Sequence, residues 1–69
     1  MTAAEMREAL AQLGLTQGAA ARRLKVDPRT LRRWVAGSLL IPDTVAEQVR
    51  AMVQDEILRR TLRGTFRGS

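Results

Sequence analysis

The absence of both cysteine and histidine is the feature that most constrains the fold of this 69-residue chain. A domain of this size buries only about 60% of the surface that its unfolded chain exposes, so its core is marginal. Small domains commonly gain the missing stability from disulfides, a metal or a partner subunit. Without cysteine and histidine, only carboxylates remain as metal ligands. We therefore expect tight helix packing or oligomerisation, with no metal and no cofactor.

The same absence argues against catalysis. The commonest general base and the commonest thiol nucleophile are both missing. The seven acidic residues are scattered along polar faces, and no two of them form a convergent pair. We therefore predict that the protein is not an enzyme, and we expect no small-molecule ligand.

The positive charge is clustered in the middle of the chain. The net charge is +5, and half of the basic residues lie within twelve positions that contain a single acidic residue, Asp27. These basic residues are Arg22, Arg23, Lys25, Arg29, Arg32 and Arg33. Clustering of this kind favours a surface that binds a polyanion, usually nucleic acid, over general solvation.

No apolar run approaches the ~20 residues needed to span a membrane. The N-terminus lacks the basic and apolar regions of a signal peptide, so we expect a cytoplasmic protein without membrane contact. Trp34 and Phe66 are the only aromatic residues, which disfavours single-stranded RNA bound by base stacking.

Strand signals are poor, and helix formers dominate the chain. The first helix is predicted over residues 3–13, with a capping box formed by Thr2 and Glu5 and a stop at Gly14. Its apolar positions are Met6, Ala9, Leu10 and Leu13, and its polar faces carry Glu5, Arg7, Glu8 and Gln12. This spacing is that of an amphipathic helix.

Two shorter helices follow. Thr16 is a good N-cap for a helix over residues 17–24. Asp27 and Pro28 then fit the N-cap and first position of a helix over residues 28–36. Gly37 ends this third helix, and the loop from Ser38 to Pro42 is short.

A fourth helix is predicted from Pro42-Asp43, with its pattern fading after Arg60. The domain is therefore expected over residues 1–60, and residues 61–69 are expected to form a flexible tail. The helix carries more apolar residues than one face needs, namely Val53, Ile57, Leu58 and Leu62. Two interpretations remain open: a longer core helix, or the contact of a homodimer.

The second and third segments are suited to cross each other closely. Ala21 is small enough for the crossing point, and Leu31 and Trp34 can seal the angle between the helices. The spacing of Trp34 from Leu31 favours core packing over base stacking. The remaining face of the third helix is then free to enter a DNA major groove.

From the run LTQGAAARRLKVDPRTLRRWVAG to Pro42, the chain resembles the lambda-repressor-like helix-turn-helix domains of the Cro/xenobiotic-response-element type. The resemblance extends over about residues 3–55 and implies an all-α, compact bundle of four to five short helices. Gln17, Ala21 and Gly37 match the family pattern. Lys25 departs from it, because the family usually has glycine there. A positive φ at a residue other than glycine costs roughly 1 kcal/mol.

The resemblance implies roles for individual residues. Base readout is assigned to Pro28, Arg29, Thr30, Arg32 and Arg33. Arg29 and Arg33 are the preferred guanine readers, since a bidentate contact gives ~1–3 kcal/mol of discrimination, whereas Arg32 fits a base or a phosphate. Contacts to the DNA backbone are assigned to Thr16, Gln17, Arg22, Arg23, Lys25 and Ser38, although Arg22 and Arg23 are equally explained as solvated cations.

These features predict a sequence-specific transcriptional regulator that binds double-stranded DNA. The simplest version is a homodimeric repressor that occupies an inverted repeat and controls its own phage or mobile-element operon. Two alternatives remain: a protein-interaction module, and an excisionase-like architectural protein that bends DNA.

Overall fold

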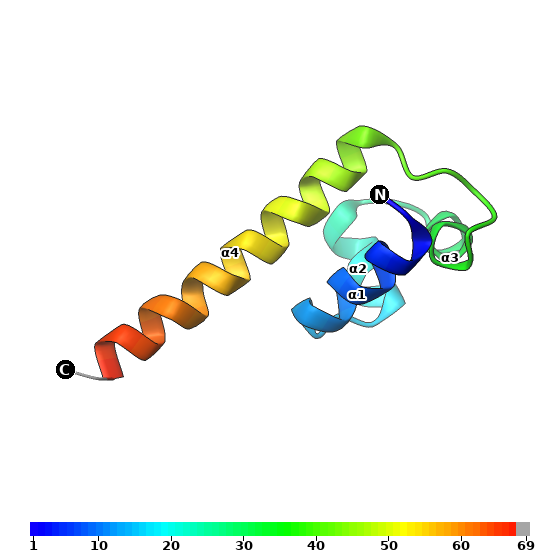
Figure 1. Ribbon diagram of the computed structural model, residues 1–69. Coiled ribbons are helices and arrows are strands. Elements are labelled where there is room, and N and C mark those ends of the chain that lie inside the picture. Colours follow the sequence, from blue (N-terminus) through cyan, green and yellow to red (C-terminus); the bar gives the residue numbers. More distant parts are fainter. Residues whose placement is uncertain (68–69) are drawn as a thin grey trace.

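The computed structural model describes residues 1–67 of the chain, and the side chains of residues 1–63. This part contains four helices and no strand: α1 (Ala3–Leu13), α2 (Gln17–Leu24), α3 (Pro28–Ala36) and α4 (Asp43–Arg67). Figure 1 shows the three short helices gathered into a body, with the long α4 passing along it. The predicted all-α fold is confirmed, and the bounds of α1, α2 and α3 are those expected from the sequence.

Side-chain caps begin the three short helices. At α1 the Thr2 hydroxyl accepts a hydrogen bond from the Glu5 amide (3.1 Å), and the Glu5 carboxylate accepts one from the Thr2 amide (2.8 Å). These bonds from the backbone and side chain of Thr2 lower the pKa of Glu5. Thr16 and Asp27 cap α2 and α3 in the same way, by accepting from the amides of Ala19 and Arg29. The caps predicted from the sequence are confirmed.

Each short helix ends at a residue in the left-handed region. Gly14 and Gly37 have φ values of 67° and 81° after α1 and α3. Lys25 takes the same position after α2, with φ 58° and ψ 45°. Its amide donates to the Arg22 carbonyl, and the next amide donates to the Ala21 carbonyl. The positive φ expected at Lys25 is therefore present.

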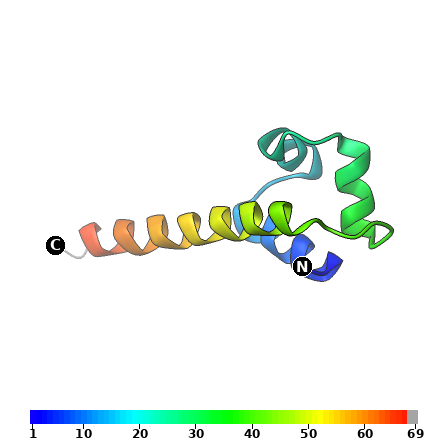
Figure 2. The same cartoon turned by 90° about the horizontal axis from the view of Figure 1, so that it is seen from above.

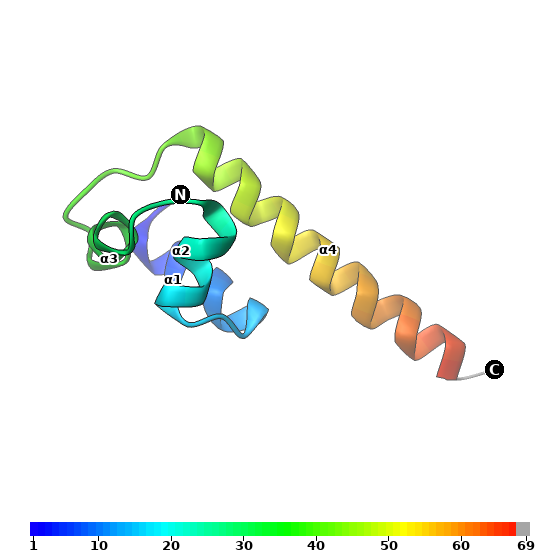
Figure 3. The same cartoon turned by 180° about the vertical axis from the view of Figure 1, so that it is seen from behind.

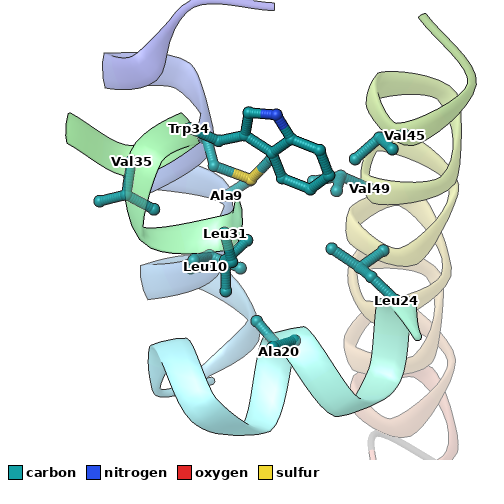
Figure 4. Packing of buried hydrophobic residues seen from close by; sticks show 11 residues of the cluster. Ala9, Leu10, Ala20, Leu24, Leu31, Trp34, Val35, Val45 and Val49 are labelled. Atoms are coloured by element: carbon teal, nitrogen blue, oxygen red, sulfur yellow. The ribbon is translucent and has the colours of Figure 1, made fainter. Parts of the chain in front are cut away.

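The core lies where α1, α2, α3 and the first half of α4 meet. α1 packs against α3 and α4, and α2 packs against α3. Figure 4 shows the Trp34 indole extending from α3 toward Val45 and Val49 of α4. Trp34 is only 4% exposed, so it is a core residue and not a stacking platform. The buried apolar residues are Met6, Ala9, Leu10, Ala20, Ala21, Leu24, Leu31, Trp34, Val35, Val45, Ala46 and Val49.

Helix α4 is longer than the apolar pattern indicated. It has 25 residues and continues seven positions beyond Arg60, where the pattern fades. Figures 1 and 2 show its C-terminal end projecting from the body, and the molecule measures 47 × 19 × 17 Å. Backbone hydrogen bonds continue without an apolar face, and ion pairs Asp55–Arg59 and Glu56–Arg60 support this stretch.

The predicted flexibility of residues 61–69 stays a prediction, and residues 68 and 69 lie outside the described range. Among the described helices, none combines the length and the apolar composition that crossing a bilayer requires.

Candidate nucleic-acid interface

Helix α3 presents an arginine face on the side opposite the core. Its buried side chains are Leu31, Trp34 and Val35. Arg29 and Arg33 are four residues apart, so they lie on one face of the helix, with Arg32 beside them. All three arginines are exposed. A helix with this division can pack into the domain by one face and offer guanidinium groups by the other.

The three arginines surround a shallow hollow of about 340 Å³. Ala36 and Ser38 complete its lining. The structure thus brings together three of the predicted base-reading residues and one residue predicted to contact the DNA backbone. Ala36 was not identified from the sequence because alanine, a common helix former, carries no polar signal. Its small side chain leaves room between the arginines.

The guanidinium groups of this hollow are available to an external anion. In the described part of the chain, no carboxylate or carbonyl oxygen accepts a hydrogen bond from the side chains of Arg29, Arg32 or Arg33. The Asp27 carboxylate accepts instead from the Arg29 backbone amide, at 2.8 Å. Guanidinium groups bind phosphate oxygens and guanine edges through paired, charge-assisted hydrogen bonds.

The other two residues predicted to read bases lie at the edge of this face. Pro28 is exposed at the first position of α3. Thr30 is half-buried on the flank of the helix and does not line the hollow. Their contact with bases stays a prediction.

The remaining residues predicted to contact phosphates belong to α2 and its ends. Thr16, Gln17, Arg22, Arg23 and Lys25 are all exposed, and none lines the hollow on α3. The Thr16 hydroxyl already accepts from the Ala19 amide, so a phosphate would meet its other free positions. Figure 3 shows α2 packed beside α3 in the same body, which places two basic helices next to each other.

Arg7 fixes the C-terminal end of α3 from another helix. The last carbonyls of a helix lack partners within it. In α3 the amides of Gly37 and Ser38 donate to the carbonyls of Trp34 and Arg33. The Arg7 guanidinium of α1 donates to the Val35 carbonyl, at 2.6 Å. The sequence placed Arg7 on a polar face and carried no signal of this contact.

Arg60 makes the equivalent contact at the end of α1. Its Nη2 atom donates to the Gln12 carbonyl (3.1 Å), while its Nε atom donates to the Glu56 carboxylate (3.2 Å). This bond joins α4 to α1 across 48 positions of sequence. It therefore fixes the direction in which α4 leaves the body, and the sequence analysis did not identify it.

The residues predicted to form a dimer contact fall into two groups. Val53 is half-buried and packs against the core. Ile57, Leu58 and Leu62 are 49%, 57% and 48% exposed. The structure thus leaves the last three available to a partner, and the contact itself stays a prediction.

Comparison with known proteins identifies the domain. The helix-turn-helix family model matches residues 6–49, which extend from α1 through the buried start of α4. This match covers more than half of the chain and contains the whole arginine face of α3. The chain has no significant match among curated proteins or among solved structures.

Proposed function

Because the chain belongs to the lambda-repressor/Cro-like helix-turn-helix family of DNA-binding transcription regulators, we propose that it is a sequence-specific repressor. The observation that carries this proposal is the arginine face of α3, where three guanidinium groups surround one hollow. Members of the family are typically not enzymes, and the site offers charge and hydrogen-bond donors without a nucleophile or a general base.

Helix α3 enters the major groove in this proposal. Arg29 and Arg33 donate paired hydrogen bonds to guanine O6 and N7, and Arg32 binds a base or a phosphate. The exposed residues at the start of α2 and Ser38 after α3 bind the flanking phosphates. Phosphate contacts position the protein, and base contacts select the sequence.

Repression follows from occupancy of the promoter. A homodimer places two α3 helices on an inverted repeat whose half-sites are about one helical turn apart. In this proposal the regulated operon is the protein's own, in a phage or another mobile element, and the protein acts in the cytoplasm.

A binding titration tests the proposal. The protein is titrated against its own upstream DNA and against a shuffled control, at several salt concentrations. We expect strong preference for the upstream DNA. Replacing Arg33 with methionine should lower specific affinity about 10-fold or more, since one bidentate base contact contributes ~1–3 kcal/mol. Arg50→Met on α4 is the matched control and should leave affinity within about 2-fold.

Two outcomes contradict the proposal. Equal binding to both DNAs, with a steep loss in salt, indicates phosphate contacts alone and favours an architectural protein. Absence of binding to either DNA favours a protein-interaction module.

A further inference from the structure

The projecting part of α4 carries an apolar face that the rest of the described chain does not cover. Ile57, Leu58 and Leu62 are each about half exposed. At 100° per residue, these three side chains point nearly opposite to Val45 and Val49, which are buried against the body. The helix therefore has two apolar faces, one for its own core and one turned outward.

The outward face is held at a fixed angle to the body. Arg60 lies within the same stretch and donates to the Gln12 carbonyl of α1 at 3.1 Å. Val53, one turn earlier, packs against the core. The outward face continues toward the N-terminus through Ala51 and Gln54, both exposed. Positions 51, 54, 58 and 61 alternate steps of three and four, the spacing of a helix–helix seam.

The charge of α4 is divided along its length. Residues 43–56 contain four carboxylates and one arginine, a net charge of −3. Residues 57–67 contain four arginines and no acidic residue, a net charge of +4. Figure 1 shows that these two segments are the near and far parts of one straight helix.

We propose that this outward face binds α4 of a second copy of the chain, and that the two helices run antiparallel. In this orientation the basic segment of each helix lies beside the acidic segment of the other. A parallel pair would place +4 beside +4 and −3 beside −3 at the 8–10 Å interaxial distance of packed helices, within about one Debye length in physiological salt. The inference rests on the proposed homodimer and adds its surface and its orientation.

The complementarity favours a second copy over other occupants. A partner for three apolar residues flanked by basic charge must offer an apolar face flanked by acidic charge. Helix α4 itself offers both, because its acidic segment flanks the same outward face. An anionic membrane would meet the arginines but would repel Asp43, Glu47 and Asp55 on the same rod.

A cysteine scan tests the orientation, since the natural chain contains no cysteine. Single variants Ala51→Cys, Gln54→Cys, Leu58→Cys and Leu62→Cys are oxidised mildly, alone and in every pairwise mixture. Antiparallel pairing predicts efficient self-crosslinking at one position near the two-fold axis, and preferential crosslinks between positions on either side of it. Ala11→Cys, exposed on α1, measures collisional crosslinking. Self-crosslinking at all four positions indicates a parallel pair and overturns the proposal.

Sedimentation equilibrium tests the surface independently. The double variant Leu58→Gln with Leu62→Gln should be monomeric, with dimer affinity lowered at least 10-fold and helix content unchanged. Arg59→Glu with Arg63→Glu keeps both leucines and should also weaken the dimer. Raising salt should weaken an antiparallel dimer, whereas it would strengthen a parallel one. A natural chain that stays monomeric, or a leucine variant that dimerises normally, overturns the proposal.

The two proposals fail in different ways. A monomeric leucine variant that still prefers the upstream half-site over shuffled DNA supports both. Loss of the DNA preference in a chain that forms the antiparallel dimer overturns only the proposed repressor. A monomeric natural chain that keeps the DNA preference overturns only the antiparallel pairing.

Discussion

Lys25 is the residue at which the backbone departs most from ordinary preference. Among the described residues it is the only one other than glycine with a positive φ, at 58°. The left-handed conformation brings the β-carbon close to the following carbonyl oxygen and costs about 1–2 kcal/mol. The turn between α2 and α3 needs this conformation, because the amides of Lys25 and Val26 must reach back to α2 carbonyls. The cation therefore occupies a position that glycine would satisfy with less strain.

We predict that Lys25→Gly stabilises the domain by about 0.5–1 kcal/mol, since relief of the strain exceeds the added freedom of the unfolded chain. Urea denaturation followed by circular dichroism measures the change. Lys25→Ala is the control and should give little or no gain, because alanine keeps the β-carbon. A loss of stability in the glycine variant would show that the lysine side chain outweighs the strain.

Trp34 is a second residue with an unusual environment. Its indole is buried among α3 and α4, and in the described part of the chain its Nε1 is the buried side-chain atom without a hydrogen-bond partner. An unsatisfied buried donor costs about 1–3 kcal/mol. The contact area of the ring within a small core offsets this cost.

At the scale of elements, the structure shows how the recognition helix is held. Helix α3 has nine residues, too few to be stable alone in water. Asp27 caps its start, Gly37 and Ser38 amides close two of its last carbonyls, and Arg7 closes a third. A cation at a helix C-terminus also interacts favourably with the helix dipole. Helix α1 therefore positions the arginine face without touching its guanidinium groups.

We predict that Arg7→Met lowers the free energy of unfolding by about 1–2 kcal/mol, the usual contribution of a hydrogen bond from a charged group. Thermal or urea denaturation measures the loss, and hydrogen exchange should show faster exchange at the C-terminal end of α3. Arg32→Met, on the exposed face of α3, should change stability by less than about 0.5 kcal/mol. Equal effects of the two substitutions would mean that the contact with Val35 contributes nothing.

For the whole molecule, stability depends on one small core. At 0.05–0.15 kcal/mol per residue, a chain of 69 residues has about 3–10 kcal/mol of stability. Leu31 is fully buried, and it comes from the helix that carries the arginine face. The core and the candidate interface are therefore two faces of the same element, and loss of one disrupts the other.

We predict that Leu31→Ala destabilises the protein by about 2–5 kcal/mol, enough to populate the unfolded state at 37 °C. Leu40 is the matched control, because it is 92% exposed in the loop before α4. Leu40→Ala should change stability by less than about 0.5 kcal/mol. Urea denaturation at several protein concentrations measures both effects and separates them from dimerisation. Comparable losses at the two leucines would contradict the observed core.

The sequence by itself determined the helices, because their ends depend on neighbours three or four positions away. The Thr2–Glu5 box, the Asp27-Pro28 start and the stops at Gly14 and Gly37 are all interactions of this range. The amphipathic spacing likewise identified Leu31 and Trp34 as core residues and left the arginines of α3 outside.

Only the tertiary structure decided which residues from different helices meet. Arg7 reaches Val35 across 28 positions and Arg60 reaches Gln12 across 48, and neither pairing leaves a periodic signal. Packing also placed Val53 against the core, and it joined Ser38 and Ala36 to the arginines in one hollow. The length of α4 beyond Arg60 escaped the apolar pattern because a helix outside the core continues by backbone hydrogen bonds and side-chain ion pairs alone.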